Sequence, residues 1–121
     1  MRVVHEGPEN TQTLASEVET ADSVVARGVG LMFQRSVPAD YALVFPFRRT
    51  ATRRLHMVCV PFDIDAVWTV DDEVTAVARL SAWTGHGSAR ADVVYELPAG
   101  AAEGVAAGDR VRRAGESGRP K

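Results

Sequence analysis

The stretch Tyr41–Phe47, "YALVFPF", places the strongest constraint on what this chain can fold into. In an extended chain, successive side chains point to opposite faces, and in this stretch both faces are apolar. A strand of this kind must be covered on both sides, which favours a closed or curved sheet, or a sheet covered by a helix. Pro46 lacks an amide hydrogen and therefore indicates an edge position or a bulge.

Further short segments have the apolar alternation or β-branched content that is typical of strands. They cover residues 2–5, 13–18, 54–60, 64–70, 74–80, 92–97 and 109–113. The acidic residues 71–73, "DDE", separate two of these segments by a tight turn, so residues 64–80 are predicted to form a hairpin.

Two other segments favour short helices. Residues 24–33, "VVARGVGLMF", carry apolar side chains at helical spacing after an N-cap at Asp22 or Ser23. Residues 98–108, "PAGAAEGVAAG", are small and end in glycine. We therefore predict a strand-dominated α+β fold, either a compact small β-barrel-like structure or a curved antiparallel sheet with one or two short helices. Residues 1–114 are expected to form one domain, followed by a disordered tail at 115–121.

The overall charge and the cysteine content exclude several classes of protein. The net charge of −2 provides no global field for nucleic acid or an anionic membrane, so neither is expected as a partner. One cysteine allows no internal disulfide and no Cys-rich zinc site. No apolar run approaches the roughly 20 residues that span a bilayer, and no signal-like segment is present. We expect a soluble, cytoplasmic protein without a cofactor, and the sequence leaves its oligomeric state open.

The segment Arg54–Trp68, "RLHMVCVPFDIDAVW", collects residue types that could ligate a metal or perform catalysis. If it is a strand, Met57 and Cys59 share one face and His56 lies on the other. A joint metal site is then excluded unless the strand bulges. The pattern favours core packing of Met57 and Cys59, and no metal site is predicted.

The candidate catalytic residues are Asp63, His56 and His86. Asp63 follows Pro61, where the chain must bend, and two roles are open to it. It could accept backbone N–H groups in the turn, or it could serve acid–base chemistry with a histidine. The first role is the commoner one. The sequence contains no complete set of nucleophile, base and orienting group.

Candidate binding residues fall into two groups. Met32, Phe45, Met57 and Trp68 could line an apolar cleft for a small molecule or a peptide. Four arginines in a predicted loop could hold an anion, namely Arg48, Arg49, Arg53 and Arg54. The favoured interpretation is a small binding module. The alternatives are an undescribed enzyme that uses Asp63 and a protein–protein adaptor.

Several segments occur in the order seen in one bacterial and archaeal family. They are "GLMFQRSV" (30–37), "ALVFPF" (42–47), "LHMVCVPFDIDAVW" (55–68), "YELPAG" (95–100) and "GDRV" (108–111). In these segments the chain resembles the family catalogued as domain of unknown function 192. It departs from that pattern at His56, where the family usually has tryptophan, and at residues 58–60, where Lys-Asn-Thr is common. The resemblance implies a small, mostly β domain and brings no established activity with it.

Overall fold

The computed structural model describes residues 1–21 and 36–115, and these form eight strands. The strands are β1 (Arg2–Glu6), β2 (Thr11–Ala15), β3 (Glu17–Thr20), β4 (Tyr41–His56), β5 (Ile64–Val70), β6 (Glu73–Leu80), β7 (His86–Pro98) and β8 (Arg110–Ala114). No helix in these two ranges is long and apolar enough to cross a membrane.

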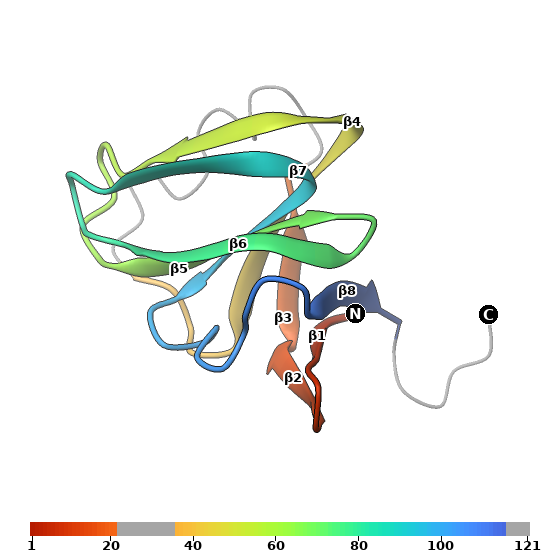
Figure 1. Ribbon diagram of the computed structural model, residues 1–121. Helices are drawn as coiled ribbons and strands as arrows, with labels where there is room; N and C mark the ends of the chain where they lie inside the picture. The colour runs from red at the N-terminus through yellow and green to blue at the C-terminus, as the bar shows by residue number, and fades with distance from the viewer. Residues whose placement is uncertain (22–35, 116–121) are drawn as a thin grey trace.

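All eight strands belong to one open, mixed sheet with the order β2-β1-β8-β6-β5-β7-β4-β3 (Figure 1). Within it, β3 and β4 run parallel and the other described pairs are antiparallel. The two outer strands of this order, β2 and β3, are separated in the chain by Ser16 alone. The sheet therefore curls until its two ends meet at Ser16. Asp40 fixes this junction, because its carbonyl oxygen accepts the amides of Ser16 and Glu17 at 2.9 Å each.

The predicted α+β class is wrong for the described residues, which contain strands and turns but no helix. The sheet is also open and mixed, and so it is neither the barrel-like structure nor the antiparallel sheet that was expected. The helix expected at 24–33 lies outside them, as does most of the expected tail. The helix expected at 98–108 is replaced by successive turns. The cause is glycine spacing, because Gly100, Gly104 and Gly108 all have φ between 91° and 95°. A left-handed residue every four positions ends each helical turn before the next one can form.

The predicted arginine loop is also not a loop, because residues 48–54 lie inside the long strand β4. β4 pairs with β7 on both sides of an irregularity between Pro46 and Ala51. The sequence signal at Pro46 thus marked a bulge, and the chain stays extended beyond it. The paired segments 51–56 and 86–91 form a two-stranded extension of the sheet, which we call the ribbon.

Two hydrophobic clusters lie on opposite faces of the sheet. One face carries Val44, Val67, Tyr95, Leu97 and Val111 with their neighbours. The other carries Phe45, Met57, Ile64, Trp68 and Val94 with theirs. The alternation of adjacent residues between the clusters confirms that the Tyr41–Phe47 stretch is apolar because both of its faces are covered. The 64–80 hairpin is confirmed as well, with its turn at Asp71 and Asp72, both at positive φ.

Candidate functional site

The apolar residues predicted to line a cleft are part of the core instead. Phe45, Met57 and Trp68 are exposed by 3%, 1% and 1%, respectively, and belong to one packed cluster. Met32 lies outside the described residues. The core position of Met57 confirms that part of the sequence analysis. The predicted core packing of Cys59 on the same strand face is wrong. β4 ends at His56, and Cys59 is partly exposed in the turn that follows, at φ 61°.

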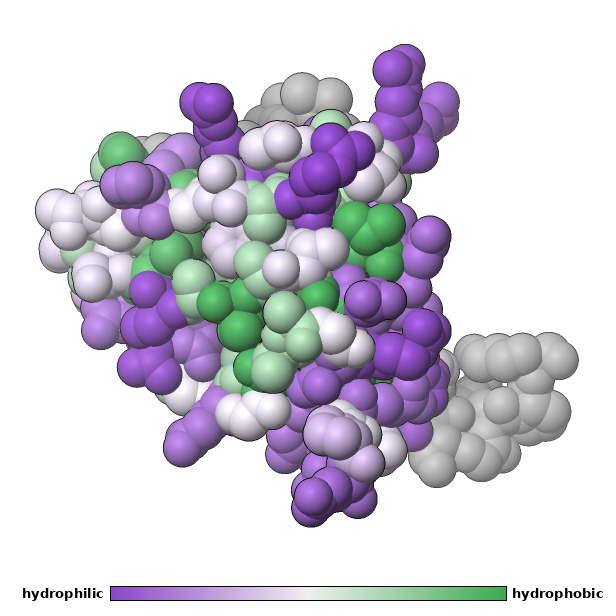
Figure 2. Space-filling model, viewed as in Figure 1, coloured by the Kyte–Doolittle hydropathy of each residue, from purple (hydrophilic) through white to green (hydrophobic). Residues whose placement is uncertain are grey.

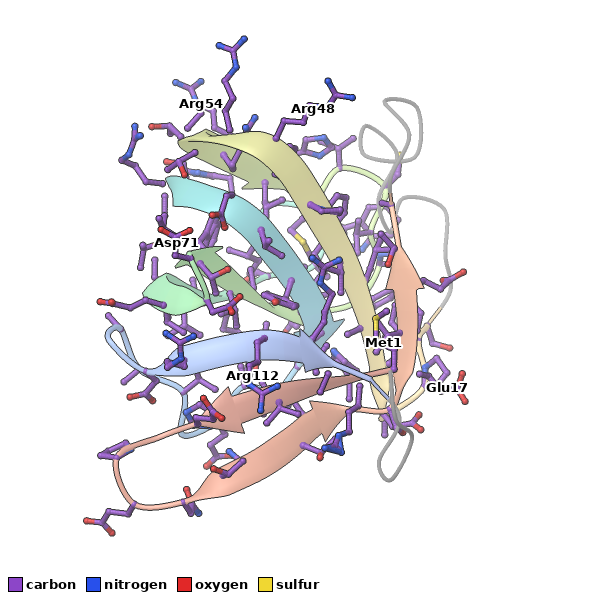
Figure 3. The ribbon with its side chains drawn as sticks, turned by 90° about the vertical axis from the view of Figure 1, so that its right-hand side faces the viewer. Met1, Glu17, Arg48, Arg54, Asp71 and Arg112 are labelled. Atoms are coloured by element: carbon purple, nitrogen blue, oxygen red, sulfur yellow. The ribbon has the colours of Figure 1, made fainter. Side chains whose placement is uncertain are left out.

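The four arginines separate into one anchored and three exposed side chains. The Arg53 guanidinium stacks 3.8 Å from the centroid of the Phe47 ring and donates to the carbonyl oxygen of Arg49 at 2.7 Å. Arg48, Arg49 and Arg54 are exposed. Figure 3 shows Arg48 and Arg54 projecting away from β4 into solvent. Arg53 therefore supports the bend of β4, and a common anion site of all four is not assembled.

The candidate catalytic residues are placed together only in part. His56 and His86 lie directly opposite each other on β4 and β7. The Nδ1 atom of His56 accepts the amide of Val58 at 3.2 Å. Asp63 accepts the amide of Ala82 at 2.8 Å through Oδ1, so it holds a second loop and not the turn after Pro61. Across the described ranges, neither histidine is hydrogen-bonded to Asp63, and no three His, Cys, Asp or Glu side chains are grouped to hold a metal ion.

The third histidine, His5, is buried and ties β1 to the turn before β8. Its Nε2 lies 2.8 Å from Asp109 Oδ2, and its Nδ1 lies 3.0 Å from the side-chain Nε2 of Gln12. The hydrogen bond from His5, together with one from the amide of Ala106, lowers the pKa of Asp109 below its usual value. Both ring nitrogens of His5 therefore have hydrogen-bond partners, so this cluster stabilises the fold.

Asp65 is a buried carboxylate with a full set of partners. Its exposure is 4%. Oδ1 accepts a hydrogen bond from Arg79, the residue opposite it on β6. Oδ2 accepts the amides of Gly100 at 2.9 Å and Ala102 at 3.0 Å. Asp65 therefore holds the turn after β7 against the sheet.

Glu96 is a buried carboxylate with one oxygen that has no partner among the described residues. It is 5% exposed, and in the described part of the chain its Oε1 atom has no hydrogen-bond partner. It alternates with Tyr95 and Leu97, and so it shares the face of Val94. Burial raises its pKa from 4.5 to about 7. A buried polar group left unsatisfied needs an explanation, and a carboxyl whose pKa is shifted to neutrality is a candidate for function.

The register places Glu96 in a single cross-strand row. Leu43 of β4 and Ala66 of β5 flank it, and Glu19 of β3 lies beyond Leu43 on the same face. Tyr41 is two residues before Leu43 and so also projects from this face. The Glu96 charge is one of the influences that raise the pKa of the Tyr41 hydroxyl, after burial and the Glu19 carboxylate.

A hollow of about 590 Å³ opens beside Glu19 and Tyr41, and we call it the Tyr41 hollow. It is lined by Glu17, Val18, Glu19, Ser36, Val37, Pro38, Asp40 and Tyr41. The Tyr41 hydroxyl donates to Glu19 Oε1 at 2.6 Å, which orients both groups. Among the described residues, three carboxylates and no basic side chain line it, so the field of this part of the lining favours a positive charge.

A second hollow, of about 560 Å³, has a different charge balance. It is lined by Pro46, Phe47, Arg48, Thr50, Asp71, Asp72, Asp92, Val93 and Arg113. Two arginines accompany its three aspartates, and Asp92 accepts the amide of Asp71 at 3.1 Å. Its acids are therefore largely compensated. Each hollow has three carboxylates in its described lining, and the two differ because only the second also has arginines.

Comparison with family models supports the resemblance seen in the sequence. The model of the domain-of-unknown-function 192 family, described as "Uncharacterized ACR", matches residues 6–113. The chain belongs to this family. Its family carries no established activity, and comparison with curated proteins gives no match.

Two crystal structures are similar in fold to this chain. One is a protein of unknown function from Novosphingobium aromaticivorans, with a TM-score of 0.81, 20% identity and coverage of 93% of this chain and 84% of that one. The other, from Sinorhizobium meliloti, is described provisionally as a transcription regulator, with a TM-score of 0.80, 24% identity and coverage of 92% and 91%. At this level of identity the likeness establishes the fold alone.

Proposed function

We propose that this protein is a binding module whose ligand is a small organic cation, such as a primary or quaternary amine, held in the Tyr41 hollow. The observation that carries the proposal is a hollow whose described lining has three carboxylates and no basic side chain. Its Tyr41 hydroxyl is under the influence of the charge of Glu96, a buried carboxyl group whose Oε1 has no partner in the described residues. We further propose a cytoplasmic location, in keeping with the single free cysteine.

The lining of the hollow supplies the groups that recognise an ammonium ion. Carboxylates of Glu17, Glu19 and Asp40 offer acceptors, and the ring of Tyr41 offers a face for a cation–π contact. Val18, Val37 and Pro38 supply apolar surface for the carbon skeleton of the ligand. A small number of polar groups on apolar walls is the usual composition of a small-molecule site.

Glu96 would make this binding depend on pH. A cation in the hollow attracts the ionised form of Glu96, whose pKa is about 7, and so favours loss of its proton. Binding should therefore tighten as the pH rises from about 6 to about 8. The direct ligand contacts are assigned to Glu19 and Tyr41, and Glu96 acts on the ligand through its charge.

NMR titration of the labelled protein with n-butylamine, and with butyrate as a matched anion, tests the proposal. The amine is expected to shift the amide signals of residues 17–19 and 36–41, and butyrate is not. Glu19→Gln and Tyr41→Phe should each weaken amine binding by roughly fivefold or more, because each removes a charged or oriented contact. Asp92→Asn removes one carboxylate from the second hollow and serves as the matched control.

Two results would refute the proposed function. One is equal binding of the amine and the carboxylate. The other is amine binding that neither Glu19→Gln nor Tyr41→Phe changes. An enzymatic role for Asp63 has less support, since its Oδ1 is occupied by the Ala82 amide and no histidine is bonded to it among the described residues.

A further inference from the structure

Two large apolar side chains are presented to solvent at one end of the molecule. Val58 is 54% exposed and Trp83 is 60% exposed. Val58 belongs to the loop between β4 and β5, and Trp83 to the loop between β6 and β7. Both loops lie at the left-hand end in Figure 1, and Figure 2 shows pale and green spheres at that margin, with a few purple ones among them. We call these two loops, residues 57–63 and 81–85, the tip.

The tip is one unit because backbone hydrogen bonds join its two loops. The amide of Met57 donates to the carbonyl oxygen of Gly85 at 3.0 Å, and the amide of Trp83 donates to that of Val60 at 2.9 Å. Asp63 adds its bond to the second loop through Oδ1. The exposed side chains are thus held on a fixed frame.

The backbone at the apex of each loop is in a conformation that its residue type disfavours. Cys59 has φ 61° in a turn closed by the Val60 amide and the Met57 carbonyl oxygen. Trp83 has φ 67° and is the central residue of a turn in which the Thr84 amide donates to Ala82 at 2.7 Å. Bulky residues rarely adopt the left-handed region, and such strain persists mainly where it serves function.

The ribbon beside the tip has one face on the core and one face in solvent. A side chain at Gly87 would come within 3.0 Å of the Trp68 ring, so glycine allows the ribbon to pack closely over the core at this point. The outer face consists of Thr52, Arg54, His56, His86, Ser88 and Arg90. No carboxylate is among them, and their two arginines outnumber the one carboxylate of the tip, the exposed Asp63. The net charge of −2 thus conceals a local basic surface next to the tip.

We propose that the tip docks on the surface of an anionic lipid bilayer. Trp83 and Val58 enter the interfacial layer, while Arg54 and Arg90 on the outer face of the ribbon contact the headgroups. Tryptophan prefers this layer because its ring is apolar and its N–H is polar. A fluid bilayer accepts a projecting apolar tip without a matching pocket, whereas a protein partner needs one. Basic residues next to the apolar anchor supply the charge complementarity.

Fluorescence with vesicles provides a direct test, because the two tryptophans report separately. Trp68 is 1% exposed, so its emission should stay constant, whereas that of Trp83 should shift to shorter wavelength when the tip enters the interface. The full-length protein is titrated with vesicles of phosphatidylcholine and with vesicles containing roughly 30% phosphatidylglycerol. We expect the blue shift and co-sedimentation with the anionic vesicles, and their loss at high salt.

Variants separate the apolar from the electrostatic contribution. Trp83→Ser and Val58→Ser should each weaken co-sedimentation by about tenfold, since each removes an apolar anchor. Arg54→Ser should weaken it roughly fivefold, in line with about 1 kcal/mol for a basic residue near an anionic surface. Arg112→Ser, on β8 and far from Arg54 in Figure 3, removes the same charge and should have no such effect.

Either of two outcomes would overturn the proposal. It fails if anionic vesicles leave the emission of the protein unchanged and do not sediment it. It also fails if the wild-type protein self-associates and Trp83→Ser abolishes this without any vesicle binding, because the tip would then be a contact between copies. Circular dichroism and a thermal melt of each variant establish that it is folded.

Discussion

Asp65 and Glu96 are both carboxyl groups that the sheet removes from water, to 4% and 5% exposure. They come from neighbouring strands, since Glu96 of β7 lies opposite Ala66 of β5, but they project from opposite faces. Asp65 has Arg79 and two backbone amides around it, whereas Glu96 has Leu43 and Ala66.

The difference shows that burial alone does not determine what an acidic residue does for a fold. Desolvation penalises both carboxylates, and three donors offset the penalty at Asp65. At Glu96 nothing comparable offsets it in the described residues, and the pKa rises to about 7. One acid thus stabilises the native state. The other has no such donors among the described residues, so burial of its charge is unfavourable.

The largest effect is expected from Asp65→Asn. The amide keeps the shape of the side chain but removes the charge and points donor hydrogens at Arg79 or at the backbone donors of Gly100 and Ala102. We expect a loss of about 3–5 kcal/mol in the free energy of unfolding, because the Gly100 and Ala102 amides each lose a bond to a charged acceptor, worth about 1.5–3 kcal/mol. Urea denaturation measures it. A loss below about 1 kcal/mol would show that the three donors do not hold the turn after β7.

The same chemical change at Glu96 should have the opposite sign. Glu96→Gln removes a carboxylate whose pKa rise corresponds to roughly 3 kcal/mol of unfavourable charge burial, so we expect a gain of about 2–3 kcal/mol at about pH 8. Because the folded-state pKa is raised, the wild-type protein regains this stability as the pH falls from about 7 to about 4.5.

The pH dependence is the measurement that isolates Glu96 from other acids. The difference between Glu96→Gln and wild type, followed by urea denaturation from about pH 8 to pH 4.5, should shrink towards zero. A difference that stays constant with pH would mean that Glu96 is already neutral or paired at pH 8. The comparison with Asp65 would then no longer hold.

A smaller effect is expected from Asp63→Asn. Asp63 is exposed and makes one hydrogen bond, to the Ala82 amide, and an asparagine oxygen can replace most of that bond. We expect a loss of about 0.5–1.5 kcal/mol, measured by thermal or urea unfolding. A loss as large as that of Asp65→Asn would place Asp63 among the structural acids of the core.

The smallest effect is the coupling between the two buried sites. Asp65 and Glu96 share no partner, so the effects of Asp65→Asn and Glu96→Gln should add to within about 0.5 kcal/mol in the double variant. A double-mutant cycle by urea denaturation measures this quantity. A larger coupling would mean that the two faces of the sheet respond together.

Local patterns predicted the parts of the fold that depend on neighbours in sequence. The period of two in residues 64–80 predicts the hairpin, and the apolar run at 41–47 predicts a strand covered on both faces. The bend after Pro61 favoured amides of the local turn as partners of Asp63, whereas its partner is the amide of Ala82 in the other loop, 19 residues along the chain. The small residues of 98–108 suggested a helix, although their three left-handed glycines at intervals of four favour repeated turns.

Long-range pairing supplied what the sequence could not. Glu96 is an acid in the strand "VVYELP", where alternation suggests either a solvent-facing residue or an edge. Its burial follows from strands on both sides, β4 and β5, which are distant in sequence. The signal that could have singled it out is the lone charge among apolar residues on both of its sides. The arginines of β4 were likewise predicted to lie in a loop. The charged run has no strand pattern of its own, and pairing with β7 keeps residues 51–56 extended.

The single-residue link at Ser16 has a consequence for how the native state opens. An open sheet usually frays at its two outer strands independently, since these strands have one neighbour each. Here β2 and β3 are the outer strands, yet Ser16 joins them and Asp40 holds both Ser16 and Glu17. Detaching one strand pulls on the other. The amide protons of β2 and β3 should therefore exchange with solvent through one shared opening, at similar rates.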